Sequence, residues 1–136
     1  MKVATSRYYH GQLIVESGLV PVATTVGMPK FPLRYHLGGL VPQVAPHGIF
    51  GKDDLTERQF KNRYVKRLEE IGPDVIAGYL EAIVQSHDSH GVVLLCFCNL
   101  DEQFCHRRMF AEWWQTKTGI VVPELEPATL FNQEEE

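Results

Sequence analysis

The sequence has no long apolar run. No stretch approaches the ~20 apolar residues that a transmembrane helix needs. The first residues, MKVATSRYYHG, contain neither the apolar core nor the small-residue cleavage site of a secretory signal peptide. We therefore expect no membrane-spanning segment and no secretion signal in this chain.

Cysteine is also scarce, because the chain contains three, which is an odd number. Two of them, Cys96 and Cys98, are separated by a single residue at the end of a predicted strand. These features argue against a framework of structural disulfides of the kind found in small secreted domains. We therefore expect the protein to be cytoplasmic, where thiols stay reduced.

A large positive charge is missing too. The formal net charge is −4, which argues against strong non-specific nucleic-acid binding. Residues 1–70 hold ten Lys and Arg against six Asp and Glu, whereas residues 71–136 hold three against eleven. The composition is otherwise that of one globular domain. We expect a single α/β domain over residues 1–126 and an acidic, disordered tail over residues 127–136.

Apolar runs and helical spacings alternate along the chain. Strands are predicted at 3–5, 19–26, 92–97 and 120–122, and helices at 56–71, 73–86 and about 105–117. A capping box at Thr56–Gln59 and the Gly72-Pro73 pair mark helix ends. This order predicts an α/β fold, a small three-layer Rossmann-like domain with a mainly parallel sheet and helices on both faces. Residues 27–51 are rich in Gly and Pro and are expected to form a long loop.

The residues with the most chemical potential gather in one stretch, LLCFCNLDEQFCHRR, residues 94–108. Cys96 and Cys98 end the predicted central strand, and Cys105, His106 and Arg107 begin the next helix. Parallel sheets bind ligands beyond the carboxyl ends of their strands. A helix start offers free N–H donors and a partial positive charge, which lower a thiol pKa and favour a bound anion.

These positions suggest roles for each group. We expect Cys96 and Cys105 to be the candidate nucleophiles or substrate contacts, and His106 to carry or orient a proton. Ser6 and Arg7 end the first predicted strand at the same edge of the sheet. We expect them to bind an anionic ligand together with Arg107.

Two other interpretations stay open. Zinc binds Cys and His readily, so Cys96, Cys98, Cys105 and His106 form an alternative zinc or thiol-redox site, although they lack the C-x2-C spacing of common structural sites. Alternatively, the thiols are inert core residues and the 27–51 loop binds a partner protein. In the leading interpretation the protein uses no metal or other cofactor.

The segment LLCFCNLDEQFCHRRMFAEWW resembles the DUF488 family, a protein family of unknown function. Its members have a strand ending in Leu-Cys, a short acidic or amide-rich loop, and Cys-His-Arg opening a helix. Cys96, Cys105, His106 and Arg107 match that pattern. The resemblance extends to TSRY and VPVATTVGMPKF near the N-terminus, covers most of the chain and implies a small Rossmann-like domain. Relatives often have Glu two residues after the first Cys, where this chain has Cys98.

The family resemblance implies no particular reaction, because none is established for the family. From the residues themselves we predict an anion-binding Cys/His/Arg pocket that carries catalytic groups. Its expected ligand is a nucleotide, a nucleic-acid end or another small phosphate-bearing molecule. If the protein is an enzyme, we expect a cysteine-dependent or Arg/His-dependent transferase or hydrolase.

Overall fold

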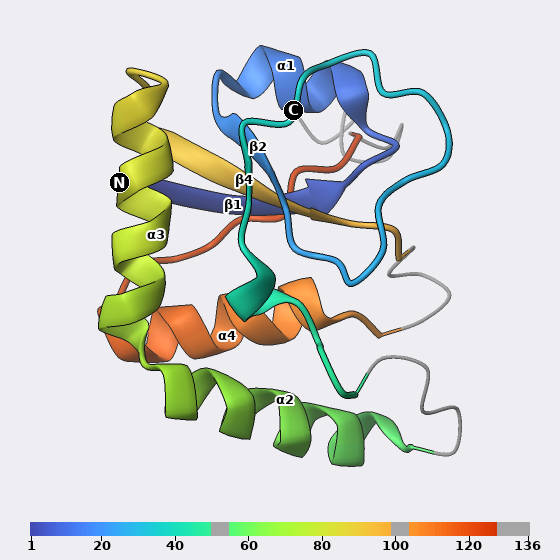
Figure 1. Cartoon of the computed structure of the whole chain (residues 1–136), viewed down its shortest axis with the longest axis vertical. Coiled ribbons are helices and arrows are strands. Elements are labelled where there is room, and N and C mark those ends of the chain that lie inside the picture. Colours follow the sequence, from blue (N-terminus) through green and yellow to red (C-terminus); the bar gives the residue numbers. More distant parts are fainter. Residues whose placement is uncertain (50–54, 99–103, 128–136) are drawn as a thin grey trace, which may run out of the picture.

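A four-stranded parallel sheet forms the centre of the protein, whose computed structural model describes residues 1–49, 55–98 and 104–127 (Figure 1). The strands are β1 (Lys2–Arg7), β2 (Val20–Ala23), β3 (Gly39–Leu40) and β4 (Gly91–Cys96). Their order in the sheet is β1-β4-β2-β3, and every pairing is parallel. This confirms the predicted α/β class with a parallel sheet.

Helices cover both faces of this sheet. They are α1 (Gly11–Ser17), α2 (Glu57–Ile71), α3 (Pro73–Ser86) and α4 (His106–Thr118), with a short 3-10 helix, η1 (Pro42–Val44), before α2. Figure 1 shows α1 on one side of the sheet and α3 and α4 on the other, with α2 outside α4. The fold is therefore the small three-layer Rossmann-like domain that the sequence predicts.

Strand β4 shows why its sequence is a continuous apolar run. It lies between β1 and β2, and all six of its residues are buried. Val92 and Leu94 belong to the hydrophobic cluster with α3 and α4, whereas Val93 and Leu95 belong to the opposite cluster, which includes Ile14 of α1. A strand covered on both faces needs apolar residues at every position. Cys96 is the last residue of this buried strand and lies at the carboxyl end of the sheet.

The predicted helix ends are confirmed by their geometry. The Thr56 hydroxyl accepts a hydrogen bond from the Gln59 backbone N–H, and the Gln59 side chain accepts one from the Thr56 N–H. Gly72 separates α2 from α3, with Pro73 at the first position of α3. Helix α4 ends at Gly119, which has a left-handed φ of 75°. Such local patterns predict helix ends well because capping bonds join residues that are neighbours in the sequence.

Two elements were not predicted from the sequence. Helix α1 has seven residues and buries one of them, Ile14, so its sequence has no readable helical period. Within the predicted 27–51 loop, the described part contains the two-residue strand β3 and the 3-10 helix η1. Helix α1 and these two short elements depend mainly on contacts with distant parts of the chain. Local sequence propensity does not reveal such contacts.

The prediction of a last strand at 120–122 is wrong in its position. The chain pairs with β1 just beyond it, through a parallel bridge between Thr5 and Glu124. The Thr5 N–H donates to the Pro123 carbonyl, and the Leu125 N–H donates to the Thr5 carbonyl. Pro123 cannot donate to a sheet ladder, so the pairing stays limited to these bonds. Residues 128–136 of the predicted acidic tail lie outside the described residues.

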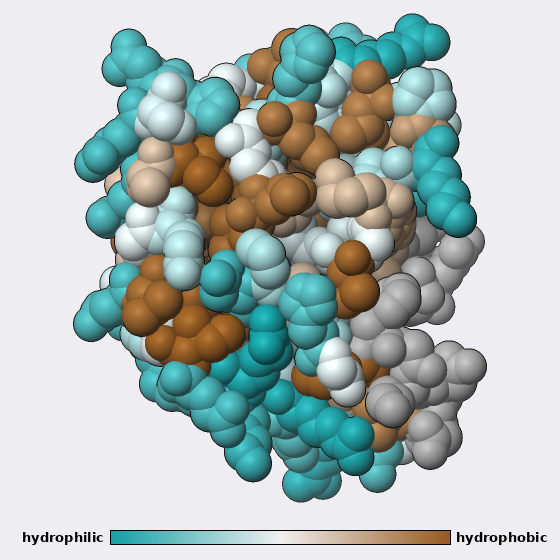
Figure 2. Space-filling model, viewed as in Figure 1, coloured by the Kyte–Doolittle hydropathy of each residue, from teal (hydrophilic) through white to brown (hydrophobic). Residues whose placement is uncertain are grey.

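The surface around this fold is mixed. Figure 2 shows hydrophobic residues in separate patches, while the surface over α2, at the bottom of the view, is mostly hydrophilic. This agrees with α2 as the outer helix, which buries Tyr64 and Leu68 against the rest of the protein. None of the helices in the described part of the chain is long and apolar enough to span a membrane.

We predict that Gly91→Ala strongly destabilises the fold. Gly91 pairs with Lys2 where β4 meets β1, and a methyl group there would overlap the Lys2 carbonyl oxygen. Because that oxygen is backbone, the strands would have to separate, at a cost of about 3 kcal/mol in the free energy of unfolding. Urea denaturation measures this change.

The matched control is Gly78→Ala on the exposed side of α3, where an added methyl group meets nothing within 4 Å. This substitution should raise stability by roughly 0.5–1 kcal/mol, since Ala favours helix more than Gly. Similar urea midpoints for the two variants would contradict the close approach of β1 and β4.

Candidate functional site

The predicted site residues meet at the carboxyl ends of β1 and β4. Cys96 is the last residue of β4 and is paired in register with Arg7, the last residue of β1. Cys105 is the N-cap of α4, and His106 and Arg107 are its first two residues. The structure therefore brings the two ends of the LLCFCNLDEQFCHRR stretch together at one edge of the sheet.

Three thiols converge there. The Sγ atoms of Cys96 and Cys105 lie 2.7 Å apart, and the Cys98 thiol is near enough to affect the pKa of both. Cys96 is fully buried and Cys105 is 4% exposed, whereas Cys98 is only partly buried. All three thiols are free. Cys98 is therefore the thiol that a ligand from solvent reaches most easily.

Arg107 fixes this thiol cluster from inside the protein. Its side chain is 1% exposed, and its Nη1 donates to Cys96 Sγ and to the Cys98 carbonyl oxygen, both at 2.8 Å. Its Nε donates to both carboxylate oxygens of Glu124 at 3.1 and 3.2 Å, and its Nη2 donates to Glu124 Oε2 at 2.8 Å. Most of its donors are thus occupied within the protein. Ligand binding by Arg107 stays a prediction.

Glu124 is a site residue that the sequence does not reveal. It lies 17 residues after Arg107, outside any helix, and no spacing pattern links the two. Its Oε1 also accepts a hydrogen bond from the Thr5 hydroxyl at 2.6 Å. Arg108 donates to the same hydroxyl at 2.9 Å and to the Val122 carbonyl at 3.0 Å. The two arginines at the start of α4 therefore hold the C-terminal segment against β1.

His106 is a buried, neutral imidazole with a defined orientation. Its Nε2 lies 2.7 Å from the Thr24 carbonyl oxygen, so this nitrogen carries the proton and donates it. The other nitrogen, Nδ1, lies 3.7 Å from Cys105 Sγ and is left as an acceptor. Burial lowers the pKa of His106, which keeps the ring uncharged near neutral pH. This geometry suits a proton acceptor for the Cys105 thiol.

The three cysteines differ in acidity. Hydrogen bonds from Cys105 and Cys96, followed by the positive charges of Arg107 and Arg7, lower the pKa of the Cys98 thiol to about 3. Burial raises the pKa of Cys96. The hydrogen bonds that Cys105 shares with the other two sulfurs, together with its burial, raise its pKa as well. These shifts favour a thiolate on Cys98 over one on Cys96 or Cys105.

Ser6 and Arg7 lie at the rim of the cluster but have different surroundings. The Ser6 hydroxyl is buried and donates to the Leu125 carbonyl at 2.7 Å, so it contacts the C-terminal segment. The Arg7 guanidinium lies 5.6 Å from the centre of the Tyr9 ring. Within the described residues its Nε has no hydrogen-bond partner. That Nε is buried, and of these two predicted anion-binding residues only Arg7 is partly exposed.

Part of the cluster also matches the alternative zinc site. Cys96, Cys105 and His106 each offer a ligand atom, and these atoms lie within 4.8 Å of one another. Two thiolates and an imidazole are ligands that zinc accepts, and the backbone carbonyl on the other ring nitrogen is a common second-shell partner. The zinc alternative stays a prediction, as does the predicted absence of a cofactor.

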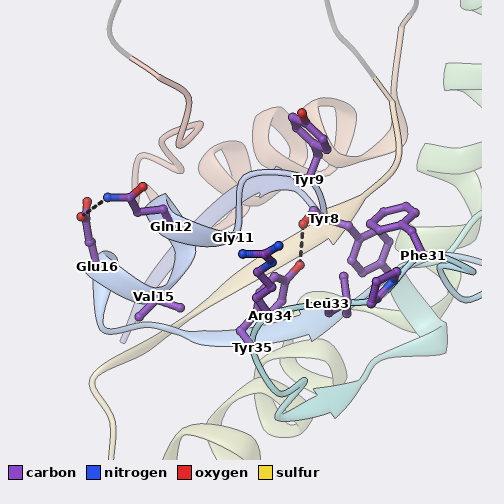
Figure 3. Close-up of a pocket in the computed structure, with 11 residues that line it drawn as sticks. Tyr8, Tyr9, Gly11, Gln12, Val15, Glu16, Phe31, Leu33, Arg34 and Tyr35 are labelled. Atoms are coloured by element: carbon purple, nitrogen blue, oxygen red, sulfur yellow. Dashed lines mark hydrogen bonds between the residues drawn. The ribbon is translucent and has the colours of Figure 1, made fainter.

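A surface cavity of about 540 Å³ lies between α1 and residues 31–35, and two of its lining residues, Tyr8 and Tyr9, directly follow Arg7 (Figure 3). Its walls combine aromatic and polar side chains with one glycine: Tyr8, Tyr9, Gly11, Gln12, Val15, Glu16, Phe31, Pro32, Leu33, Arg34 and Tyr35. Figure 3 shows the Tyr35 hydroxyl bonded to the Tyr8 carbonyl, at 2.7 Å. Sequence reasoning missed this cavity, because its two walls lie about twenty residues apart in segments without a motif.

Fold and site together define a small Rossmann-like domain with a Cys/His/Arg cluster at the carboxyl edge of its sheet. The family model described as DUF488-N3a, active DUF488-N3 subclade, matches residues 27–118. This match covers more than half of the chain, so the protein belongs to the DUF488 family. It includes the thiol cluster and α4 but not Arg7 or Glu124. No curated protein and no solved structure matches the chain.

We predict that Glu124→Ala destabilises the protein by about 3 kcal/mol, because it leaves the buried Arg107 charge without its carboxylate. Urea denaturation measures the change. Glu126→Ala, an exposed neighbour, is the control and should change stability by less than about 0.5 kcal/mol. If both variants unfold at the same urea concentration, Glu124 does not balance the Arg107 charge.

We also predict that Cys98 is the first cysteine to react with iodoacetamide at about pH 5. Its lowered pKa makes it a thiolate there, whereas Cys96 and Cys105 are buried thiols. Peptide mapping by mass spectrometry after brief exposure measures the labelling of each residue. Urea-unfolded protein is the control, in which all three should label at similar rates. Equal labelling in the folded protein would refute a selective Cys98 thiolate.

Proposed function

We propose that this protein is a thiol-dependent transferase or hydrolase that acts on a phosphate-bearing ligand. The observation that carries the proposal is the convergence of the Cys96 and Cys105 thiols and the Cys98 backbone around a buried guanidinium at the carboxyl edge of the sheet. That edge is where parallel α/β sheets commonly bind their ligands.

In this proposal Cys98 is the attacking group. It is the most exposed thiol of the three, and its sulfur is stabilised as a thiolate by hydrogen bonds from Cys96 and Cys105. Those two cysteines, which the sequence suggested as nucleophiles, are too buried to meet a ligand without movement. Their role is to orient and stabilise the reactive sulfur. The bond that forms joins Cys98 Sγ to the electrophilic atom of the ligand.

Proton movement in this proposal follows the sulfur cluster. Cys105 shares a hydrogen bond with Cys98, and the free Nδ1 of His106 lies 3.7 Å from Cys105 Sγ. When the leaving group departs, its bond to the electrophilic atom breaks and Cys105 can supply the proton it needs; Cys105 regains a proton from the water or second substrate that releases the product. Water then releases the product from Cys98 in a hydrolase, or a second substrate does so in a transferase.

Arg7 binds the phosphate of the ligand in this scheme. The Arg7 side chain is only partly buried at this edge of the sheet, and its positive charge acts on the Cys98 sulfur. A guanidinium binds phosphate strongly because it donates two parallel hydrogen bonds. The donors of Arg107 are largely occupied by Glu124 and the sulfur cluster, so Arg107 contributes only its positive charge.

We predict that a panel of nucleotides and simple phosphate esters contains a ligand that raises the melting temperature of the protein. Arg7→Ala should weaken its binding by about 2 kcal/mol, since a charged hydrogen bond is lost. Cys98→Ser should keep the binding but abolish turnover, which mass spectrometry of the ligand products measures. Arg58→Ala, on the exposed start of α2, is the matched control and should change neither quantity.

Two results would overturn the proposal. The first is that Arg7→Ala and Cys98→Ser leave both the melting shift and turnover of every ligand unchanged. The second is that the purified protein contains one zinc ion per chain and loses it only on unfolding. In that case the cysteines are metal ligands, and the alternative zinc module replaces the thiol enzyme.

A further inference from the structure

The cavity beside the thiol cluster begins where Arg7 ends. Tyr8 and Tyr9 follow Arg7 directly and form one end of the cavity, while Phe31 and Tyr35 come from the segment opposite α1. Its volume of about 540 Å³ lies in the range typical of small-molecule sites. It is therefore large enough to hold the organic part of a ligand whose phosphate lies at Arg7.

The walls of the cavity are fixed by specific contacts. The Tyr35 hydroxyl donates to the Tyr8 carbonyl at 2.7 Å, which holds the 31–35 segment against the end of β1. Gly11 keeps the floor open, because a methyl group there would already press on the Tyr35 ring at 3.3 Å. Tyr9 is 76% exposed and Phe31 is 43% exposed, so both leave ring surface available to a ligand.

A hydrogen bond and aromatic contacts join the cavity to the strand that carries Cys96. The Tyr8 N–H donates to the Cys96 carbonyl at 3.0 Å, so the cavity wall and the strand that carries the thiol are bonded. The Tyr8 ring lies 4.8 Å from the Phe97 ring, and Phe31 lies 6.5 Å from the same ring. Phe97 is the residue between Cys96 and Cys98. Two residues that line the cavity, Tyr8 and Phe31, therefore pack against the residue that joins the two cysteines.

We infer that this cavity binds the base and sugar of a mononucleotide whose phosphate reaches Arg7 and the thiol cluster. The inference rests on the proposed function and narrows its ligand to one substrate class. Exposed aromatic rings provide stacking surfaces for a base, and stacking tolerates any base because each has a π-face. The polar side chains of Gln12 and Arg34 line the same cavity and suit the hydroxyl and carbonyl groups of a nucleoside.

Isothermal titration calorimetry tests the inference with the four ribonucleoside 5′-monophosphates, their nucleosides and inorganic phosphate. At least one nucleotide should bind at least tenfold more tightly than inorganic phosphate. Phe31→Ala and Tyr9→Ala should each weaken that nucleotide by about tenfold, the loss expected for one stacking partner, and leave phosphate binding unchanged. Tyr79→Ala, an exposed tyrosine on α3, is the matched control and should leave every affinity unchanged.

The outcomes separate this inference from the proposed function. If inorganic phosphate or phosphate esters bind and turn over but no nucleotide binds more tightly, the cavity is not a nucleotide site although the thiol enzyme stands. The same follows if a 5′-phosphorylated oligonucleotide binds while mononucleotides do not, or if both aromatic variants bind the nucleotide like the unaltered protein. If no panel member binds or reacts, both proposals fail.

Discussion

The buried guanidinium of Arg107 is the group on which both the fold and the candidate site depend. It lies at the start of α4, and it bonds to Cys96 at the end of β4, to the Cys98 backbone and to Glu124 near the C-terminus. A charge removed from water is costly unless it is paired and hydrogen-bonded. The native arrangement of α4, β4 and the C-terminal segment is the one that satisfies this requirement.

The burial and pairing of Arg107 also explain which groups of the site are charged. Burial alone would lower the pKa of Arg107, but Glu124 and the neighbouring sulfurs raise it, so the guanidinium stays charged. That charge is neutralised by Glu124, and Arg7 adds a second positive charge at the rim. A further negative charge is therefore favourable near Cys98. A Cys98 thiolate supplies such a charge on a nucleophilic atom.

The sequence predicts those parts of the structure that depend on neighbouring residues. The capping box of α2, the Gly72-Pro73 junction and the apolar run of β4 are local signals, and the structure confirms all three. The meeting of Cys96 with Cys105 was also predictable, because a parallel strand and the helix after it share one edge of the sheet. Glu124 and helix α1 were not, since their positions depend on contacts distant in the sequence or on a single buried side chain.

The same division between local and long-range contacts separates the residues that hold the site from those that can act in it. Cys96, Cys105 and Arg107 are buried within a network that joins distant segments, so changing them alters the fold together with the chemistry. Arg7 and Cys98 are only partly buried, and each has neighbours that already support its charge. Substitutions at these two rim residues therefore report on ligand binding and reaction more directly than substitutions within the Cys-His-Arg motif itself.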